Sequence, residues 1–113
     1  KKIRFFKNME PLDFLYLLKN SRCLIGNSSV GIRECSFMGV PVVNIGTRQN
    51  RRERGSNIVD VDYCKDQIKS AIQNQINNKL IISDKIYGNG NSGKKIADIL
   101  SKIELNFHKT ITY

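Results

Sequence analysis

The sequence has no tryptophan, two prolines and one histidine, His108, among its 113 residues. Its three cysteines, Cys23, Cys35 and Cys64, form no CxxC pair. The residue spacing of a zinc site or of a disulfide framework is therefore absent. No apolar run reaches the ~20 residues that a membrane-spanning helix needs, and these residues contain no recognisable signal peptide. We expect a soluble domain without membrane or metal partners, in a reducing, cytoplasmic compartment where the cysteines are buried apolar side chains.

Acidic residues are scarce relative to basic ones. The 10 Asp and Glu face 19 Lys and Arg, which gives a formal net charge of +9. Such a surface attracts anions. The basic residues gather at 1–7 and 48–55, without the interleaved aromatic residues of a base-stacking platform, and this argues against a nucleic-acid partner. The charge fits either a solvated lysine-rich surface or a phosphorylated small-molecule ligand.

Apolar periodicity predicts alternating strands and helices in a chain whose length fits one domain. Pro11 suits the first turn of a helix, and Gly39 suits a left-handed cap that ends one. The predicted strands and helices are, in chain order, strand 3–6, helix 11–20, strand 23–25, helix 29–38, strands 42–45 and 57–61, and helices 66–77 and 94–103. This order predicts an α/β fold with a Rossmann-like parallel sheet covered by helices on both faces.

The stretch GNSSVGIREC at 26–35 lies between a predicted strand and a predicted helix. Ligands of open α/β sheets bind beyond the carboxyl ends of the strands. Backbone amides at the start of the helix, together with the hydroxyls of Ser28 and Ser29, would hold a phosphate group well. Alternatively, Asn27 or Ser28 is an ordinary helix N-cap, and the two interpretations can hold together.

Glu34 follows on the same predicted helix, three residues after Gly31. Helical side chains lean toward the N-terminus, so we expect its carboxylate to lie over the glycine and to face the phosphate site. A carboxylate accepts hydrogen bonds and repels phosphate, so a sugar hydroxyl is the better partner. A ribose next to a diphosphate satisfies both conditions. The alternative is a solvated glutamate paired with Arg33.

Arg48 follows the predicted strand 42–45. If the strands are parallel, Arg48 lies at the same sheet edge as the 26–29 turn, where a guanidinium can bind phosphate with two hydrogen bonds. The alternative is one solvated arginine among several in this loop. Phe14 is equally ambiguous, because a phenylalanine in LDFLYLL is usually a core residue.

The run YGNGNSGKK at 87–95 satisfies GxGxxG and nearly satisfies a P-loop. Lys95, however, stands where Mg²⁺ binding requires Ser or Thr, and a second βαβ half with its acidic residue is missing. We interpret both matches as accidental. The run is predicted to be a Gly-Asn turn leading to Ser92 as a helix cap.

Four segments in this order resemble the C-terminal part of the hydrolysing UDP-N-acetylglucosamine 2-epimerases: GNSSVGIREC, GVPVVNIGTRQ, ERGSNIVDV and YGNGN. The resemblance runs from about Met9 to Ile103. Non-hydrolysing 2-epimerases are less similar, because their corresponding turn carries Ser-Gly-Gly and Gln-Glu-Glu where this chain has Ser-Ser-Val-Gly and Arg-Glu. The resemblance implies a GT-B architecture, two Rossmann-like domains with a UDP-sugar in the cleft, in which residues 1–113 are the latter part of the C-terminal UDP-binding domain.

The resemblance also implies roles for six residues: the diphosphate is held by Ser28 and Ser29, the ribose hydroxyls by Glu34, the UDP moiety by Arg48, and the uracil is flanked by Phe14 and the backbone near Met9. The family's proton-transfer residues lie in parts that this chain does not hold. The resemblance therefore implies no catalytic residue, metal or cofactor here, and a missing N-terminal domain as partner. An incomplete sheet would leave an edge that invites homo-oligomers.

Two other functions remain open from the sequence. A GT-B glycosyltransferase would use a similar phosphate-binding helix to hold its nucleotide-sugar. A basic binding module without catalysis would hold nucleic acid or another anion through charge alone.

Overall fold

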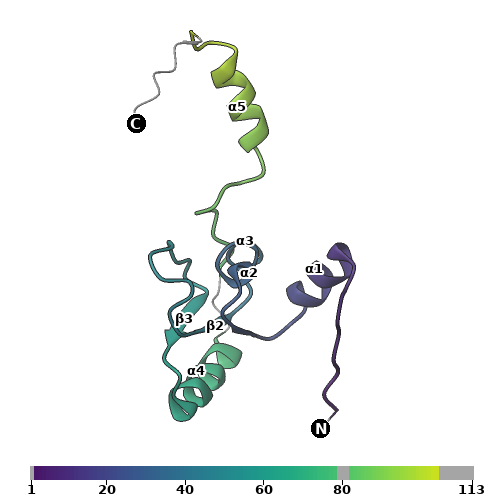
Figure 1. Cartoon of the computed structure of the whole chain (residues 1–113), viewed down its shortest axis with the longest axis vertical. Coiled ribbons are helices and arrows are strands. Elements are labelled where there is room, and N and C mark those ends of the chain that lie inside the picture. Colours follow the sequence, from purple (N-terminus) through teal and green to yellow (C-terminus); the bar gives the residue numbers. More distant parts are fainter. Residues whose placement is uncertain (1, 79–81, 105–113) are drawn as a thin grey trace, which may run out of the picture.

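The structure is a computed structural model that describes residues 2–78 and 82–104 (Figure 1). Three strands form a parallel sheet in the order β1-β2-β3. Their bounds are β1 Leu24–Gly26, β2 Val42–Ile45 and β3 Ile58–Val61, and Val42 of the central strand aligns with both Leu24 and Ile58. The predicted parallel α/β sheet is confirmed for this part of the chain.

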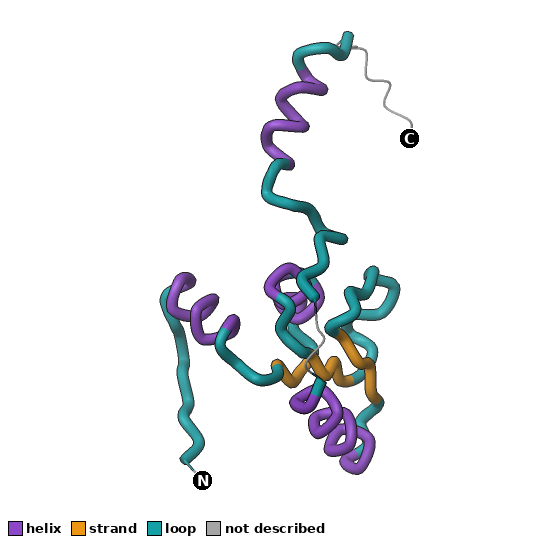
Figure 2. Tube along the Cα trace, turned by 180° about the vertical axis from the view of Figure 1, so that it is seen from behind, coloured by secondary structure: helices purple, strands orange, loops and turns teal. Residues whose placement is uncertain are grey.

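The helices flank the sheet and extend beyond it. Their bounds are α1 Pro11–Lys19, α2 Ser29–Ile32, α3 Glu34–Met38, α4 Lys65–Asn77 and α5 Ser92–Leu100. Helices α2 and α3 lie on one face of the sheet and α4 on the other, while α1 stands beside α3 (Figure 1). Seen from behind, α5 projects away from the sheet at the end of a long connection (Figure 2).

Local sequence explains where the first helices begin and end. Pro11 occupies the first turn of α1, as expected. The helix ends where Asn20 Nδ2 and Ser21 Oγ donate to the carbonyls of Tyr16 and Leu18, both at 2.7 Å. Gly39 ends α3 in the left-handed conformation, with φ 69° and ψ 30°, which confirms the predicted cap.

The core lies between the sheet and the α1–α3 side. Leu18, Cys35, Val40 and Val42 form its buried centre, and Phe14 is among the partly buried side chains packed against it. On the other face, α4 is fixed by a buried amide, because Gln75 Nε2 donates to the carbonyls of Val42 at 2.9 Å and Asn57 at 2.8 Å. These hydrogen bonds satisfy backbone groups near the amino ends of two strands.

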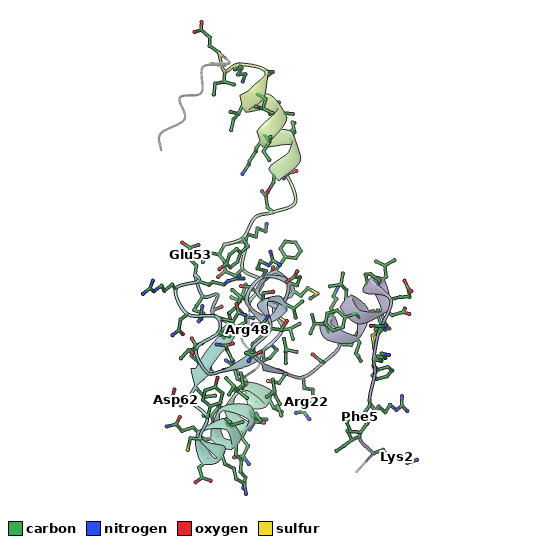
Figure 3. The ribbon with its side chains drawn as sticks, viewed as in Figure 1. Lys2, Phe5, Arg22, Arg48, Glu53 and Asp62 are labelled. Carbon is green, nitrogen blue, oxygen red and sulfur yellow. The ribbon has the colours of Figure 1, made fainter. Side chains whose placement is uncertain are left out.

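Several sequence predictions were wrong. Residues 3–6 form no strand: they lie in an extended segment without a neighbouring strand, and Phe5 is 91% exposed (Figure 3). The predicted helix 29–38 breaks at Arg33 into α2 and α3. Ser92 is the first residue of α5, whose cap position belongs to Asn91. Cys64 is exposed, so only Cys35 fits the expected fully buried thiol, with Cys23 intermediate.

The different burial of the cysteines gives a direct test of the fold. Burial, reinforced by the charge of Glu34 and by Cys23, raises the pKa of the Cys35 thiol to about 12. At mildly alkaline pH we expect iodoacetamide to alkylate exposed Cys64 about a hundredfold faster than Cys35, because the thiolate is the reactive form. Peptide mass spectrometry measures both rates, and denaturant should equalise them. Equal rates in the folded protein would contradict the burial of Cys35.

Candidate functional site

The turn between β1 and α2 is a capped helix start. Gly26 has φ 148°, a conformation that favours glycine, and Ser28 Oγ accepts a hydrogen bond from the backbone N–H of Val30 at 3.3 Å. Ser28 is therefore the N-cap of the short helix α2, one of the two interpretations left open by the sequence. Asn27 is not the cap, and its side chain contacts the loop that follows β2 instead.

That loop follows β2 and reaches the turn directly. Arg48 Nη1 donates to Asn27 Oδ1 at 3.4 Å, and Gln49 Nε2 donates to the Asn27 carbonyl at 2.8 Å. The prediction that Arg48 shares a sheet edge with the 26–29 turn is confirmed, and Ser28, Ser29 and Arg48 come from these two joined segments. Gln49, which is 3% exposed, was not among the residues predicted from the sequence, because its burial comes from contact with the distant turn at Asn27.

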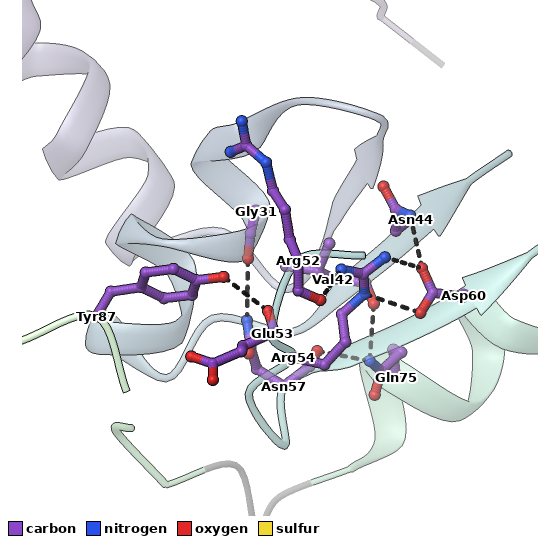
Figure 4. Close-up of polar contacts among 10 residues, drawn as sticks. All are labelled: Gly31, Val42, Asn44, Arg52, Glu53, Arg54, Asn57, Asp60, Gln75 and Tyr87. Atoms are coloured by element: carbon purple, nitrogen blue, oxygen red, sulfur yellow. Dashed lines mark hydrogen bonds and ion pairs between the residues drawn. The ribbon is translucent and has the colours of Figure 1, made fainter. Parts of the chain in front are cut away.

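We call residues 47–54 the arginine loop, which Figure 3 marks at Arg48 and Glu53. Its last residue binds β3 through both oxygens of Asp60: Arg54 Nε lies 3.0 Å from Oδ2, and Arg54 Nη2 lies 3.3 Å from Oδ1 (Figure 4). Asn44 Nδ2 donates to the same carboxylate at 2.6 Å. Within residues 2–78 and 82–104, Arg54 is the loop arginine that has a carboxylate partner, so the charges of Arg48 and its neighbours remain free to bind an anion.

The Asp60 carboxylate makes this anchor sensitive to acid. Burial raises the pKa of Asp60. Hydrogen bonds from Arg54 and Asn44, together with the Arg54 charge, lower it by more, so the pKa falls below the ordinary value of 3.8. A carboxyl with a lowered folded-state pKa stabilises the fold at neutral pH and loses that contribution as the pH falls through this pKa.

We therefore expect the free energy of unfolding to decrease more between about pH 4 and pH 2 for the wild type than for Asp60→Asn. Urea unfolding at a series of pH values measures the difference. The same acid sensitivity in both proteins would show that the Asp60 anchor does not contribute.

Glu34 lines a pocket of about 600 Å³ between α1, α3 and segment 84–92. Its Oε2 atom is shielded from solvent and has no hydrogen-bond partner among the described residues. Its Oε1 lies 3.9 Å from Arg33 Nη2, a long and partly exposed ion pair of the kind that contributes little. The pair with Arg33 fits the alternative of a surface glutamate, whereas the shielded Oε2 atom still lacks a donor, as a ligand-binding carboxylate would before its ligand binds.

The prediction that the Glu34 carboxylate lies over Gly31 was wrong. Gly31 faces the sheet, where an added Cβ would lie 2.9 Å from a Val42 methyl group and 3.3 Å from one of Leu24. The glycine thus permits close packing of α2 on the strands. Glu34 begins a separate helix after the break at Arg33, and this break explains why the two residues do not share a helix face.

The remaining predicted residues lie at α1. Phe14 packs against the core, and its neighbour Leu15 lines the Glu34 pocket. Met9 is half-buried just before the helix. The structure therefore brings α1 to the wall of the pocket, while the contacts of Phe14 and Met9 with a base stay predictions.

The glycine-rich run also lines this pocket, which the sequence analysis did not foresee. Tyr87, Gly88, Gly90 and Ser92 line it together with Glu34. The contact depends on packing between segments far apart in the chain, so the local pattern carried no signal for it.

Two other structural features are absent from the described part of the chain. Residues 2–78 and 82–104 contain no cluster of three or more His, Cys, Asp or Glu suited to a metal ion. None of the helices in the same ranges has the length and apolar character to span a membrane. His108 lies outside the described residues.

The capped turn and the arginine loop place polar and cationic groups at the carboxyl edge of the parallel sheet. This is the edge at which α/β folds bind their ligands.

Comparison with known proteins identifies the family. The family described as UDP-N-acetylglucosamine 2-epimerase matches residues 1–101, and the chain belongs to this family. Over 104 residues it is 36% identical to a UDP-N,N'-diacetylbacillosamine 2-epimerase (hydrolyzing) of Legionella pneumophila, covering 92% of this chain and 28% of that protein. It is also 36% identical to a UDP-N-acetylglucosamine 2-epimerase of Neisseria meningitidis, covering 80% of this chain and 25% of the relative.

A third relative is described by the sugar polymer that it helps to make. The polysialic acid biosynthesis protein P7 of Escherichia coli is 38% identical over 80 residues, which cover 71% of this chain and 20% of that protein. The chain therefore matches between 20% and 28% of the length of these three relatives.

Proposed function

We propose that residues 1–113 are the UDP-binding portion, in the C-terminal domain, of a GT-B hydrolysing 2-epimerase that acts on UDP-N-acetylglucosamine or a related UDP-amino-sugar. The products are UDP and the 2-epimeric free sugar used for sialic-acid-type sugars. The observation that carries the proposal is the contact of Arg48 with Asn27, because it joins a helix-start turn and a cationic loop at one sheet edge.

The joined segments suit a diphosphate. The Ser28 hydroxyl accepts from the backbone of Val30, which leaves its proton free to donate to a phosphate oxygen. Ser29 supplies a second hydroxyl at the start of α2. Arg48 is exposed and already oriented by Asn27, so its guanidinium can form charge-assisted hydrogen bonds to the same group.

The Glu34 pocket suits the nucleoside. The unpartnered Oε2 atom of Glu34 needs a donor, and a ribose hydroxyl provides one. Family resemblance assigns Phe14 and the backbone near Met9 to the uracil, and α1, which carries Phe14, also supplies Leu15 to the pocket wall.

In the proposed reaction the C2 proton is removed and the bond from the anomeric carbon to UDP breaks, and the resulting glycal adds water at the anomeric carbon and regains a proton at C2 on the opposite face. Negative charge on the leaving diphosphate grows as the bond breaks. Preoriented hydroxyls and Arg48 stabilise this charge without reorganising in the transition state. The groups that transfer the C2 proton are proposed to come from the N-terminal domain and from the first part of the C-terminal one.

The test uses the complete protein, as its open reading frame encodes it, with UDP-N-acetylglucosamine and UDP-N,N'-diacetylbacillosamine as substrates. Proton NMR should show UDP and a free 2-epimeric sugar accumulating together. A 2-epimerised UDP-sugar would instead identify a non-hydrolysing enzyme. Transfer of the sugar to an added acceptor would identify a glycosyltransferase, and each of these results would overturn the proposal.

The 113-residue chain alone should release no UDP above background, because proton transfer requires a base within hydrogen-bond reach of C2. Glu34 is the acidic residue of this chain that the proposal places at the nucleotide, and it binds ribose. Turnover by the purified chain, abolished by mutating one of its own residues, would show that the chemistry is misplaced.

A further inference from the structure

Tyr87 touches both halves of the nucleotide site. Its ring lines the Glu34 pocket, and its hydroxyl donates to the carbonyl of Glu53 in the arginine loop at 2.9 Å (Figure 4). The two residues are far apart in the sequence, so this hydrogen bond joins the pocket wall to the loop that carries Arg48.

The segment that carries Tyr87 is itself anchored. The backbone N–H of Asp84 donates to the Ser36 carbonyl at 2.9 Å, and Ser83 Oγ donates to the Phe37 carbonyl. Asp84 Oδ1 accepts from the N–H of Ile86 at 3.0 Å. Tyr87 is therefore held on α3, the helix that also begins with Glu34.

Hydrogen bonds within the arginine loop connect its conformation at Glu53 to its conformation at Arg48. Within it, the N–H of Asn50 donates to the Thr47 carbonyl at 3.0 Å and that of Arg52 to the Gln49 carbonyl at 3.4 Å. Arg51 adopts φ 65°, a conformation that a non-glycine residue keeps only when its surroundings fix it. Fixing Glu53 thus restricts the whole turn, including the free cationic side chains that face the solvent.

We propose that Tyr87 is a positioning residue of the nucleotide site: it couples the ribose pocket at Glu34 to the arginine loop and so holds the loop in its phosphate-binding conformation. This inference rests on the proposed function. It assigns to the YGNGN run a role in recognising the diphosphate through the loop, in addition to forming a turn.

The experiment measures binding of two ligands to the complete protein, UDP by calorimetry and uridine by ligand-observed NMR. Tyr87→Phe keeps the ring and removes the hydroxyl, so UDP affinity should fall about fivefold, the factor for one typical hydrogen bond, while uridine affinity stays unchanged. Tyr87→Ala also removes the ring and should weaken both ligands. Tyr16→Phe, on the exposed face of α1, is the matched control and should change neither affinity.

A double-mutant cycle separates positioning from a general structural effect. Once Arg48→Ala has removed the cation, Tyr87→Phe should weaken UDP binding by less than it does in the wild type. Additive losses, an equal loss for UDP and uridine, or no loss with Tyr87→Phe would each overturn the role of Tyr87. If Glu34→Ala weakens UDP binding while Tyr87→Phe has no effect, the proposed function stands and this inference fails. A wild-type protein that does not bind UDP would overturn both.

Discussion

Replacing Glu34 by alanine in the complete enzyme is expected to weaken UDP binding by about 1 to 3 kcal/mol, the range for hydrogen bonds to a charged group. The reason is the Oε2 atom, which is shielded from solvent and has no hydrogen-bond partner among the described residues. A ribose hydroxyl would satisfy it, and alanine removes that acceptor. Calorimetric titration with UDP measures the change.

The ligand gives the first control for this prediction. The loss from Glu34→Ala should nearly vanish for the 2′,3′-dideoxy analogue of UDP, because that ligand has no hydroxyl to donate. Glu104→Ala removes an exposed glutamate shortly after α5 and should leave UDP affinity unchanged. An unaltered affinity of Glu34→Ala for UDP would return Glu34 to the role of a surface residue paired with Arg33.

Replacing Gly55 by alanine is expected to destabilise the fold by about 1 to 3 kcal/mol, the usual cost of overpacking a filled interior. Gly55 is buried against α3, where an added Cβ would overlap Ser36 Oγ and lie 2.7 Å from Asn57 Oδ1. Asn57 cannot easily move, because its Nδ2 donates to the carbonyls of Gly31 and Val40 at 3.4 and 2.9 Å. Urea unfolding of the complete protein measures the loss as a lower midpoint.

A second substitution tests the cause of this loss. Ser36 Oγ is buried without a hydrogen-bond partner among the described residues, so Ser36→Ala removes the obstructing atom without breaking a hydrogen bond. The double variant Gly55→Ala/Ser36→Ala should therefore be more stable than Gly55→Ala alone. Strictly additive effects would show that the clash with Ser36 is not the source of the destabilisation.

Elements with a strong local pattern were predictable from the sequence. Strand β2 is a short β-branched run after a glycine and a proline, and α4 shows apolar residues at helical spacing. The strand predicted at 3–6 failed because its pattern expresses only propensity. A strand also needs a partner, and nothing in IRFF states which segment would pair with it.

The candidate site was predictable to the extent that parallel topology determines it. Once β1 and β2 were taken as parallel, the loop after each strand had to lie at one edge, and Arg48 does reach Asn27. The contact of Tyr87 with Glu53 and the burial of Gln49 arise from loop packing between distant segments. Amide side chains usually lie at the surface and tyrosine is intermediate in burial, so the sequence positions of Gln49 and Tyr87 alone did not indicate these contacts.

The order of the strands has a consequence for how this part of the protein folds. Each of the three described strands pairs with its neighbour in the sequence. Each pairing therefore closes a short loop and costs less chain entropy than a pairing between strands far apart in the sequence. The sheet can therefore grow from one end to the other during synthesis, with β1 and β2 able to pair before β3 leaves the ribosome. The contacts of Arg48 and Gln49 with Asn27 need only β1 and β2, whereas the Arg54 anchor of the arginine loop forms once β3 has docked.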